Sequence, residues 1–236
     1  MALRPWSPIP IRDNGEPLDE LPPELLRLEP HPYLSLGAPY GSGGGPFRLR
    51  QGVIARLLAA QDELGRRQPG WRLAIFDAWR PLAVQRFMVR HALVEECRRR
   101  GLDPERPGAA LREVEVLVGR FWAPPSNDPN TPPPHSTGAA VDLTLADAAG
   151  ALIAMGGEID ALGPESEPEH HAVVAATNPA SPEAQWHRRR RLLAECLSAA
   201  GFAQHPNEWW HYSHGDQLWA WRLGEPEACY GRTSED

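Results

Sequence analysis

The stretch PPSNDPNTPPP, residues 124–134, restricts the fold of this chain more than any other feature, because six of its eleven residues are proline. Proline lacks a backbone N–H and clashes with the preceding turn of a helix, so the stretch can form neither a helix nor a central strand. It must run as an irregular connection between regular elements, and it delivers the chain to His135.

Hydrophobic periodicity predicts helices and strands on both sides of this connection. Apolar residues recur at helical spacing in residues 51–67, and they alternate with polar residues in residues 139–145. Ser181 caps a further helix, and Gly201 ends it. The expected helices are 51–67, 82–100, 108–121 and 182–200, and the expected strands are 71–78, 139–145 and 208–213.

Charge and cysteine content argue against several classes of function. All 24 basic residues are arginine and 31 residues are acidic, which gives a net charge of −7 and argues against a nucleic-acid partner. Three scattered cysteines form neither a disulfide framework nor a cysteine-rich zinc site. We find no signal peptide and no apolar stretch of about 18 residues, so we expect a cytoplasmic protein without a membrane partner.

Two distant segments carry the residue types of a metal site. HSTGAAVD, residues 135–142, and EWWH, residues 208–211, each supply an imidazole and a carboxylate. His135, Asp142 and His211 suit a three-ligand zinc site with an open coordination position. Glu208 is then placed to accept a proton from water at that position, which predicts metal-assisted hydrolysis.

The strand patterns set two conditions on this site. Asp142 alternates with apolar neighbours, so its side chain should point away from the core and into a cleft. Glu208 and His211 would face opposite sides of a flat strand, so the segment must twist, bulge or end there if both are to reach one metal. The alternative is that Trp209 and Trp210 pack into the core and leave the charged side chains outside.

Arg80 lies in the motif DAWRP, at the C-terminal end of a predicted strand. Two roles are open to it. It can form an ion pair with Asp77, or it can stabilise an oxyanion, for which a permanently charged and planar guanidinium is well suited.

The motifs DAWRP, HSTGAAVDLTL and EWWHY, in this order, resemble those of the zinc D-alanyl-D-alanine dipeptidases, some of which cause vancomycin resistance. The resemblance implies an α+β fold with a small antiparallel sheet flanked by helices, as in D,D-carboxypeptidases and the hedgehog signalling domain. It also implies one zinc ion per chain. In this family His135, Asp142 and His211 match the zinc ligands, Glu208 the general base and Arg80 the residue that stabilises the tetrahedral intermediate.

The same resemblance implies a substrate pocket and its contents. Asp160 matches the acid that holds the free ammonium of the substrate, and Tyr33 matches a tyrosine that lines the same pocket. The expected substrate is a small dipeptide, with D-alanyl-D-alanine as the first choice. Pro133 stands where the family usually has a serine, and the insert GSGGG, residues 41–45, lengthens a neighbouring loop. Both departures bear on which dipeptide is cleaved.

The candidate residues run from Arg80 to His211, and one site must collect them. We therefore expect a single dipeptidase domain over residues 31–236, preceded by a proline- and acid-rich arm over residues 1–30 that lies across it. We expect His170 and His171 to form a loop outside the ligand set. Two other functions stay open: a D,D-carboxypeptidase or endopeptidase acting on cell-wall peptides, and a zinc-stabilised binding domain without catalysis.

Overall fold

The computed structural model describes residues 4–41 and 44–233, and its centre is a five-stranded sheet. Its strands are, in spatial order, β2 (Leu26–Arg27), β4 (Arg72–Asp77), β5 (Ala140–Ala146), β7 (His211–Ser213) and β6 (Ala203–Gln204). All neighbouring pairs are antiparallel except the edge strand β2, which runs parallel to β4. A second, two-stranded antiparallel sheet pairs β1 (Leu18–Glu20) with β3 (Arg48–Arg50).

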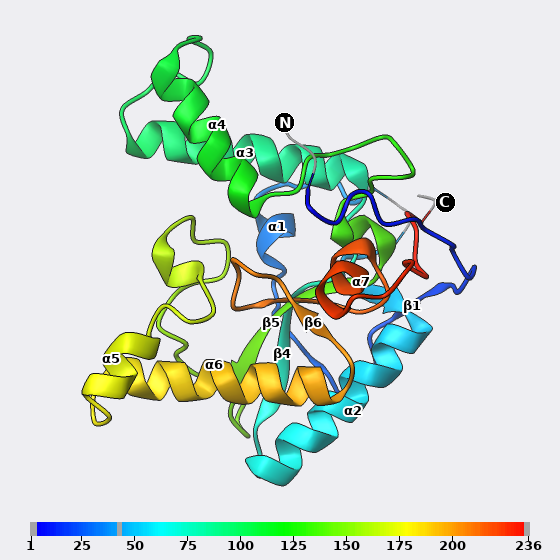
Figure 1. Cartoon of the computed structure of the whole chain (residues 1–236), viewed down its shortest axis with the longest axis vertical. Coiled ribbons are helices and arrows are strands. Elements are labelled where there is room, and N and C mark those ends of the chain that lie inside the picture. The colour runs from blue at the N-terminus through cyan, green and yellow to red at the C-terminus, as the bar shows by residue number, and fades with distance from the viewer. Residues whose placement is uncertain (1–3, 42–43, 234–236) are drawn as a thin grey trace.

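Helices cover the sheet and extend beyond it at one end. They are α1 (Pro32–Ser35), α2 (Gln51–Arg67), α3 (Leu82–Arg99), α4 (Ala109–Phe121), α5 (Ala172–Thr177), α6 (Pro182–Ala199) and α7 (Gln217–Leu223). Helices α2 and α6 contact each other at one end of the molecule, and α3 and α4 lie side by side at the other (Figure 1). The expected α+β fold is confirmed.

The main hydrophobic core lies between the central sheet and helices α2 and α6. It includes Leu57 of α2, Leu193 of α6, and Val141, Leu143 and Leu145 on one face of β5, all of them fully buried. Burial of each such side chain stabilises the fold by about 1.5–3 kcal/mol. The opposite face of β5 carries Asp142 and Thr144, as the alternation predicted, so the central strand presents its polar positions away from this core.

The predicted elements agree with the structure except at the last strand. The helices expected at 51–67, 82–100, 108–121 and 182–200 and the strands expected at 71–78 and 139–145 are present, with ends that differ by at most one residue. The strand expected at 208–213 is wrong at its start, because β7 begins at His211. Residues 205–210 form the hairpin loop between β6 and β7, and the backbone N–H of His205 donates to the carbonyl of His211 across its base.

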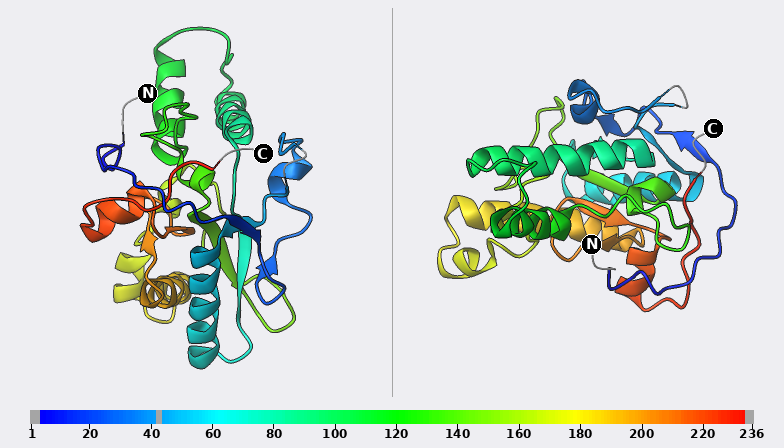
Figure 2. Two further views of the ribbon diagram at one scale, coloured as in Figure 1. Left: turned by 90° about the vertical axis from the view of Figure 1, so that its right-hand side faces the viewer. Right: turned by 90° about the horizontal axis from the view of Figure 1, so that it is seen from above.

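The N-terminal segment packs along the molecule beside the C-terminal segment (Figure 2). Trp6 is buried, Ile11 forms a bridge with Ala228, and residues 18–27 contribute strands to both sheets. The domain division after residue 30 stays a prediction. In the glycine-rich insert, residues 42–43 lie outside the described residues. None of the helices in the described part of the chain combines the length and the apolar character that a membrane span requires.

Candidate active site

Three elements bring the predicted metal ligands together. His135 lies in the 3-10 turn Pro134–Thr137 that follows the prolines, Asp142 lies on β5, and His211 lies on β7 directly opposite Asp142 in the strand register. Gly138 joins the turn to β5 with a φ of 70°, and a Cβ atom at this position would collide with Leu18. Glycine is therefore required where the chain turns from one ligand towards the next.

The ligand atoms are spaced as a zinc ion requires. His135 Nε2 lies 3.2 Å from His211 Nδ1 and 3.2 Å from Asp142 Oδ2, and His211 Nδ1 lies 3.0 Å from Asp142 Oδ1. Zinc bonds of about 2.0–2.1 Å in a tetrahedral arrangement place the ligand atoms about 3.3 Å apart. The three side chains form the one cluster of suitable metal-binding groups found within the described residues. Their donor set and spacing fit zinc.

Hydrogen bonds orient both imidazoles for this role. The Nδ1–H of His135 donates to the carbonyl of Ala78 at 2.7 Å, which turns Nε2 towards the centre of the cluster. Nε2 of His211 lies 3.3 Å from Ser213 Oγ, which turns Nδ1 inward. Such partners set the tautomer of a metal-binding histidine. Burial opposes ionisation of Asp142, but His135 and His211 hold its pKa below the ordinary value, so its carboxylate is charged.

Glu208 lies in the hairpin loop with its carboxylate beside the cluster. Its Oε2 is 3.7 Å from His211 Nδ1, and its Oε1 is buried and accepts no hydrogen bond from the described residues. His205 Nδ1 is 3.5 Å away but accepts the backbone N–H of Asn207, so it has no proton to donate. Burial, Asp142 and Asp160 raise the pKa of Glu208 well above its ordinary value. A buried oxygen without a partner is available to a water molecule.

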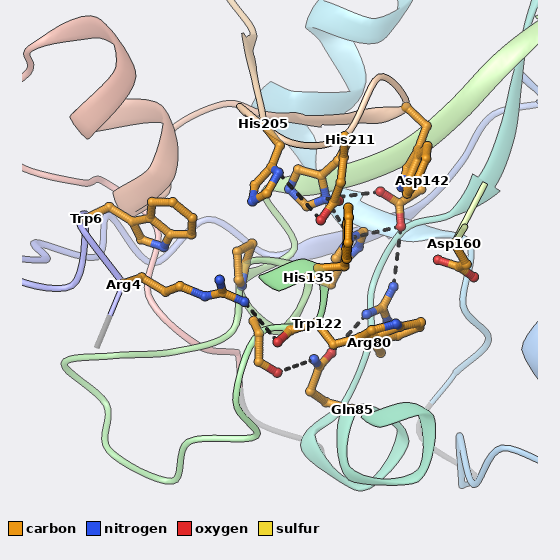
Figure 3. Close-up of a pocket in the computed structure, with 15 residues that line it drawn as sticks. Arg4, Trp6, Arg80, Gln85, Trp122, His135, Asp142, Asp160, His205 and His211 are labelled. Carbon is orange, nitrogen blue, oxygen red and sulfur yellow. Dashed lines mark hydrogen bonds and ion pairs between the residues drawn. The ribbon is translucent and has the colours of Figure 1, made fainter. Parts of the chain in front are cut away.

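Arg80 forms the expected ion pair with Asp77 and also lines the pocket. Its Nη2 and Nε donate to Asp77 Oδ2 at 2.8 and 3.1 Å, and its Nη1 donates to Gln85 Oε1 at 2.9 Å. Nη2 also lies 3.4 Å from Asp142 Oδ2. The ion pair thus fixes the planar guanidinium beside the ligand cluster, and the two roles left open by the sequence are compatible (Figure 3).

Asp160 lines the same pocket, and Tyr33 supports it from outside. The Tyr33 hydroxyl donates to Asp160 Oδ2 at 2.8 Å, whereas Tyr33 is not among the residues that line the pocket. Burial, with the negative charge of Asp142, raises the pKa of Asp160 to about 7. Its backbone φ of 67° lies in the left-handed region, which is uncommon for a residue other than glycine and is often found at functional sites.

The pocket also contains residues that the sequence analysis did not identify. Five that bear on the argument are Arg4, Trp6, Gln85, Trp122 and His205. His205 stands three residues before Glu208, so its sequence position could have drawn attention to it. No local pattern marks the other four, which reach the site through the packing of distant segments. His170 and His171 lie between helical turns, and His171 Nε2 donates to the carbonyl of Gly156 away from the ligand cluster.

Comparison with known proteins identifies relatives along the whole chain. The family described as D-ala-D-ala dipeptidase matches residues 28–229. A D-alanyl-D-alanine dipeptidase of Synechocystis sp. is 45% identical over 240 residues, covering 98% of this chain and 97% of the relative. One of Escherichia coli is 33% identical over 143 residues, covering 61% of this chain and 55% of the relative. A Zn(II)-bound vancomycin-resistance D,D-pentapeptidase has 14% identity and a TM-score of 0.44, covering 89% of this chain and 88% of that one.

Proposed function

This chain belongs to the D-ala-D-ala dipeptidase family, and we propose that it is a zinc-dependent dipeptidase that hydrolyses D-alanyl-D-alanine. The observation that carries the proposal is the arrangement around His135, Asp142 and His211. Their donor atoms lie 3.0–3.2 Å apart, and the free Oε1 of Glu208 lies in the same pocket. A purely structural metal site would need neither a buried carboxylate oxygen without a hydrogen bond nor an open coordination position.

His135, Asp142 and His211 would hold one zinc ion per chain. Bound zinc would lower the pKa of water towards about 7 and polarise the carbonyl of the scissile peptide bond. The hydrogen bond from His135 to Ala78 and the contact of His211 with Ser213 keep the ligand nitrogens turned inward, so the site needs little rearrangement to accept the ion.

Glu208 moves the proton in the reaction. It takes a proton from the attacking water as the new C–O bond forms, and it delivers that proton to the leaving nitrogen as the C–N bond breaks. Burial and the negative charges of Asp142 and Asp160 raise its pKa, which makes its carboxylate a stronger base than that of an ordinary glutamate. Arg80, held by Asp77 and Gln85, donates N–H groups to the carbonyl oxygen as negative charge develops on it.

Asp160 sets the length of the substrate at one end of the pocket. Its carboxylate pairs with the free ammonium of the dipeptide, and the Tyr33 hydroxyl holds it in position. A longer peptide has no ammonium at this point and would leave a buried carboxylate unpaired, which costs free energy. Arg4 and Trp6 line another side of the pocket. A pocket lined on both sides of the ligand cluster favours a dipeptide over a cell-wall polymer, which needs an open groove.

The partner of this protein would accordingly be a small dipeptide, without nucleic acid and without a membrane. The net charge of −7 supports the exclusion of nucleic acid. A cytoplasmic location is supported by Cys97, Cys196 and Cys229, which are all free, as in a reducing compartment.

A substrate screen tests the proposal. The zinc-loaded protein is assayed with D-Ala-D-Ala, with its L,D and L,L stereoisomers, and with a muropeptide that ends in D-Ala-D-Ala. We expect kcat/KM to be highest for free D-Ala-D-Ala. Preferred cleavage of the muropeptide would identify a carboxypeptidase instead, and a lack of hydrolysis of any substrate after zinc is restored would identify a binding domain.

A further inference from the structure

We infer that Arg4 binds the C-terminal carboxylate of the substrate, so that the N-terminal segment selects substrates that end immediately after the second residue. The inference deepens the proposed dipeptidase function and rests on it. It assigns a role to a residue that lies more than a hundred positions from every proposed metal ligand and that no motif singles out.

Arg4 and Asp160 lie on opposite sides of the ligand cluster. Both line the pocket that contains His135 and His211, and Figure 3 shows Arg4 on one side of the two histidines and Asp160 on the other. A dipeptide whose ammonium pairs with Asp160 places its scissile carbonyl at the cluster. Its second residue then extends towards Arg4. Two extended residues span at most about 7 Å, which limits how far the substrate carboxylate can lie from its ammonium.

The guanidinium of Arg4 has no anionic partner at ion-pair distance among the described residues. Its Nη1 and Nη2 donate to the neutral carbonyls of Arg120 and Trp122, at 3.3 and 2.9 Å. Its Nε is buried and has no hydrogen-bond acceptor. A partly buried cation with an unused donor is costly, and a carboxylate entering the pocket would satisfy both its charge and its free N–H.

The other arginine of the pocket is already engaged. Arg80 donates through Nε, Nη1 and Nη2 to Asp77 and Gln85, and it lies close to Asp142. Its contacts place it beside the cluster and near Tyr33, on the side of the ammonium site. Arg4 is therefore the arginine that remains for the carboxylate end.

Packing holds Arg4 in position before a substrate binds. Its backbone N–H donates to Ser7 Oγ at 3.1 Å, and its guanidinium lies 5.7 Å from the ring centre of Trp6. Trp6 is 6% exposed and packs edge-on against His205. Gln217 donates to the carbonyls of Ser7 and Ile9, at 3.2 and 2.6 Å. Preorganisation of this kind lowers the entropic cost of binding.

Replacing the substrate carboxylate by an amide tests the inference. kcat/KM is measured for D-Ala-D-Ala and for D-Ala-D-Ala amide with the zinc-loaded wild type, Arg4→Gln and Arg4→Lys. We expect the wild type to prefer the acid, Arg4→Gln to lose roughly 10–100-fold on the acid and little on the amide, and Arg4→Lys to recover part of the loss. Arg12→Gln is the matched control, because Arg12 lies in the same segment but pairs with Glu227 at the surface.

Two outcomes would overturn the inference. An equal loss on acid and amide would mean that Arg4 acts through Glu208 or through the packing of the segment, and an equal preference of the wild type for acid and amide would mean that no carboxylate is recognised. If the wild type cleaved neither compound, the proposed function would fail. Calorimetric titration with both compounds would then still decide the role of Arg4, because equal affinity of wild type and Arg4→Gln for the acid excludes it.

Discussion

Glu208 Oε2 lies 3.7 Å from His211 Nδ1, although residues three apart on a flat strand face opposite ways. The hairpin resolves this conflict, because β7 begins only at His211 and Glu208 belongs to the preceding loop. Trp209 and Trp210, between them, are buried, as either interpretation of the sequence allowed. Glu208 and His211 are buried as well, so the alternative that leaves the charged side chains outside is wrong. The loop therefore holds the aromatic rings in the interior and both polar side chains at the ligand cluster.

Glu208→Ala should retain zinc and lose turnover. The three ligand side chains are unchanged, whereas the residue that moves the proton is gone, so kcat should fall by about 10²–10⁴-fold. Zinc content per chain by atomic absorption and kcat for D-Ala-D-Ala are measured on the same sample. Wild-type turnover in this variant would remove Glu208 from the proposed role of general base.

His211→Ala should lose the metal, whereas His205→Ala should keep it. The two imidazoles are neighbours, with ring centres 5.4 Å apart, but the Nδ1 of His205 accepts a backbone N–H and is not turned to the cluster. Chelation of the wild type should abolish activity, and one equivalent of zinc should restore it. Equal zinc content in the two variants would contradict the proposed ligand set.

Arg80→Ala should lower kcat by about 10²–10³-fold, the usual effect of losing one oxyanion-stabilising group. It should also lower the free energy of unfolding by about 1.5–3 kcal/mol, because Asp77 loses its buried cationic partner but keeps its contacts with His31 and Tyr40. Urea denaturation measures the stability loss, and kcat is corrected for the folded fraction. Asp77→Asn separates the effect on stability from the effect on kcat, since it weakens the support of Arg80 but keeps the guanidinium. Equal kcat in wild type and Arg80→Ala would refute the role of Arg80 in stabilising the oxyanion.

Dipeptide binding should weaken as the pH falls through the pKa of Asp160. The pKa is raised to about 7, so the carboxylate is neutral below that pH and cannot pair with an ammonium, which stays protonated up to about pH 8. Zinc beside Asp142 offsets the charge of that carboxylate, so the transition in the loaded protein should lie between the ordinary value of about 4 and about 7.

Calorimetry in a Glu208→Gln background measures this transition without turnover. Asp160→Asn should abolish the pH dependence and weaken binding of the free dipeptide, while an N-acetylated dipeptide should bind both proteins equally weakly. An unchanged pH profile in Asp160→Asn would show that the ammonium is not read by this residue.

Sequence patterns were sufficient wherever the deciding interactions are short-range. The helix at 51–67 was placed to the residue, and Ser181 caps α6 by accepting the N–H of Ala184, as its position before Pro182 indicated. The alternation around Asp142 put its side chain on the correct face of β5, because strand periodicity is local. The motif resemblance then assigned the metal ligands, and the structure brings all three together.

The amino-acid sequence alone predicted the four long helices and the strands β4 and β5, because these depend on residue type and local spacing. Its motifs indicated the family and the proposed ligand set through their resemblance to known dipeptidases. Only the tertiary structure decided that the 208–210 segment is a loop, that Tyr33 supports Asp160 without lining the pocket, and that Arg4 faces the cluster from the N-terminal segment. The physical reason is that these contacts join residues far apart in the sequence. Arg4 donates to the carbonyl of Trp122, and Gln217 donates to the carbonyl of Ile9 in the segment that carries Arg4, and no periodicity or cap connects these parts of the chain.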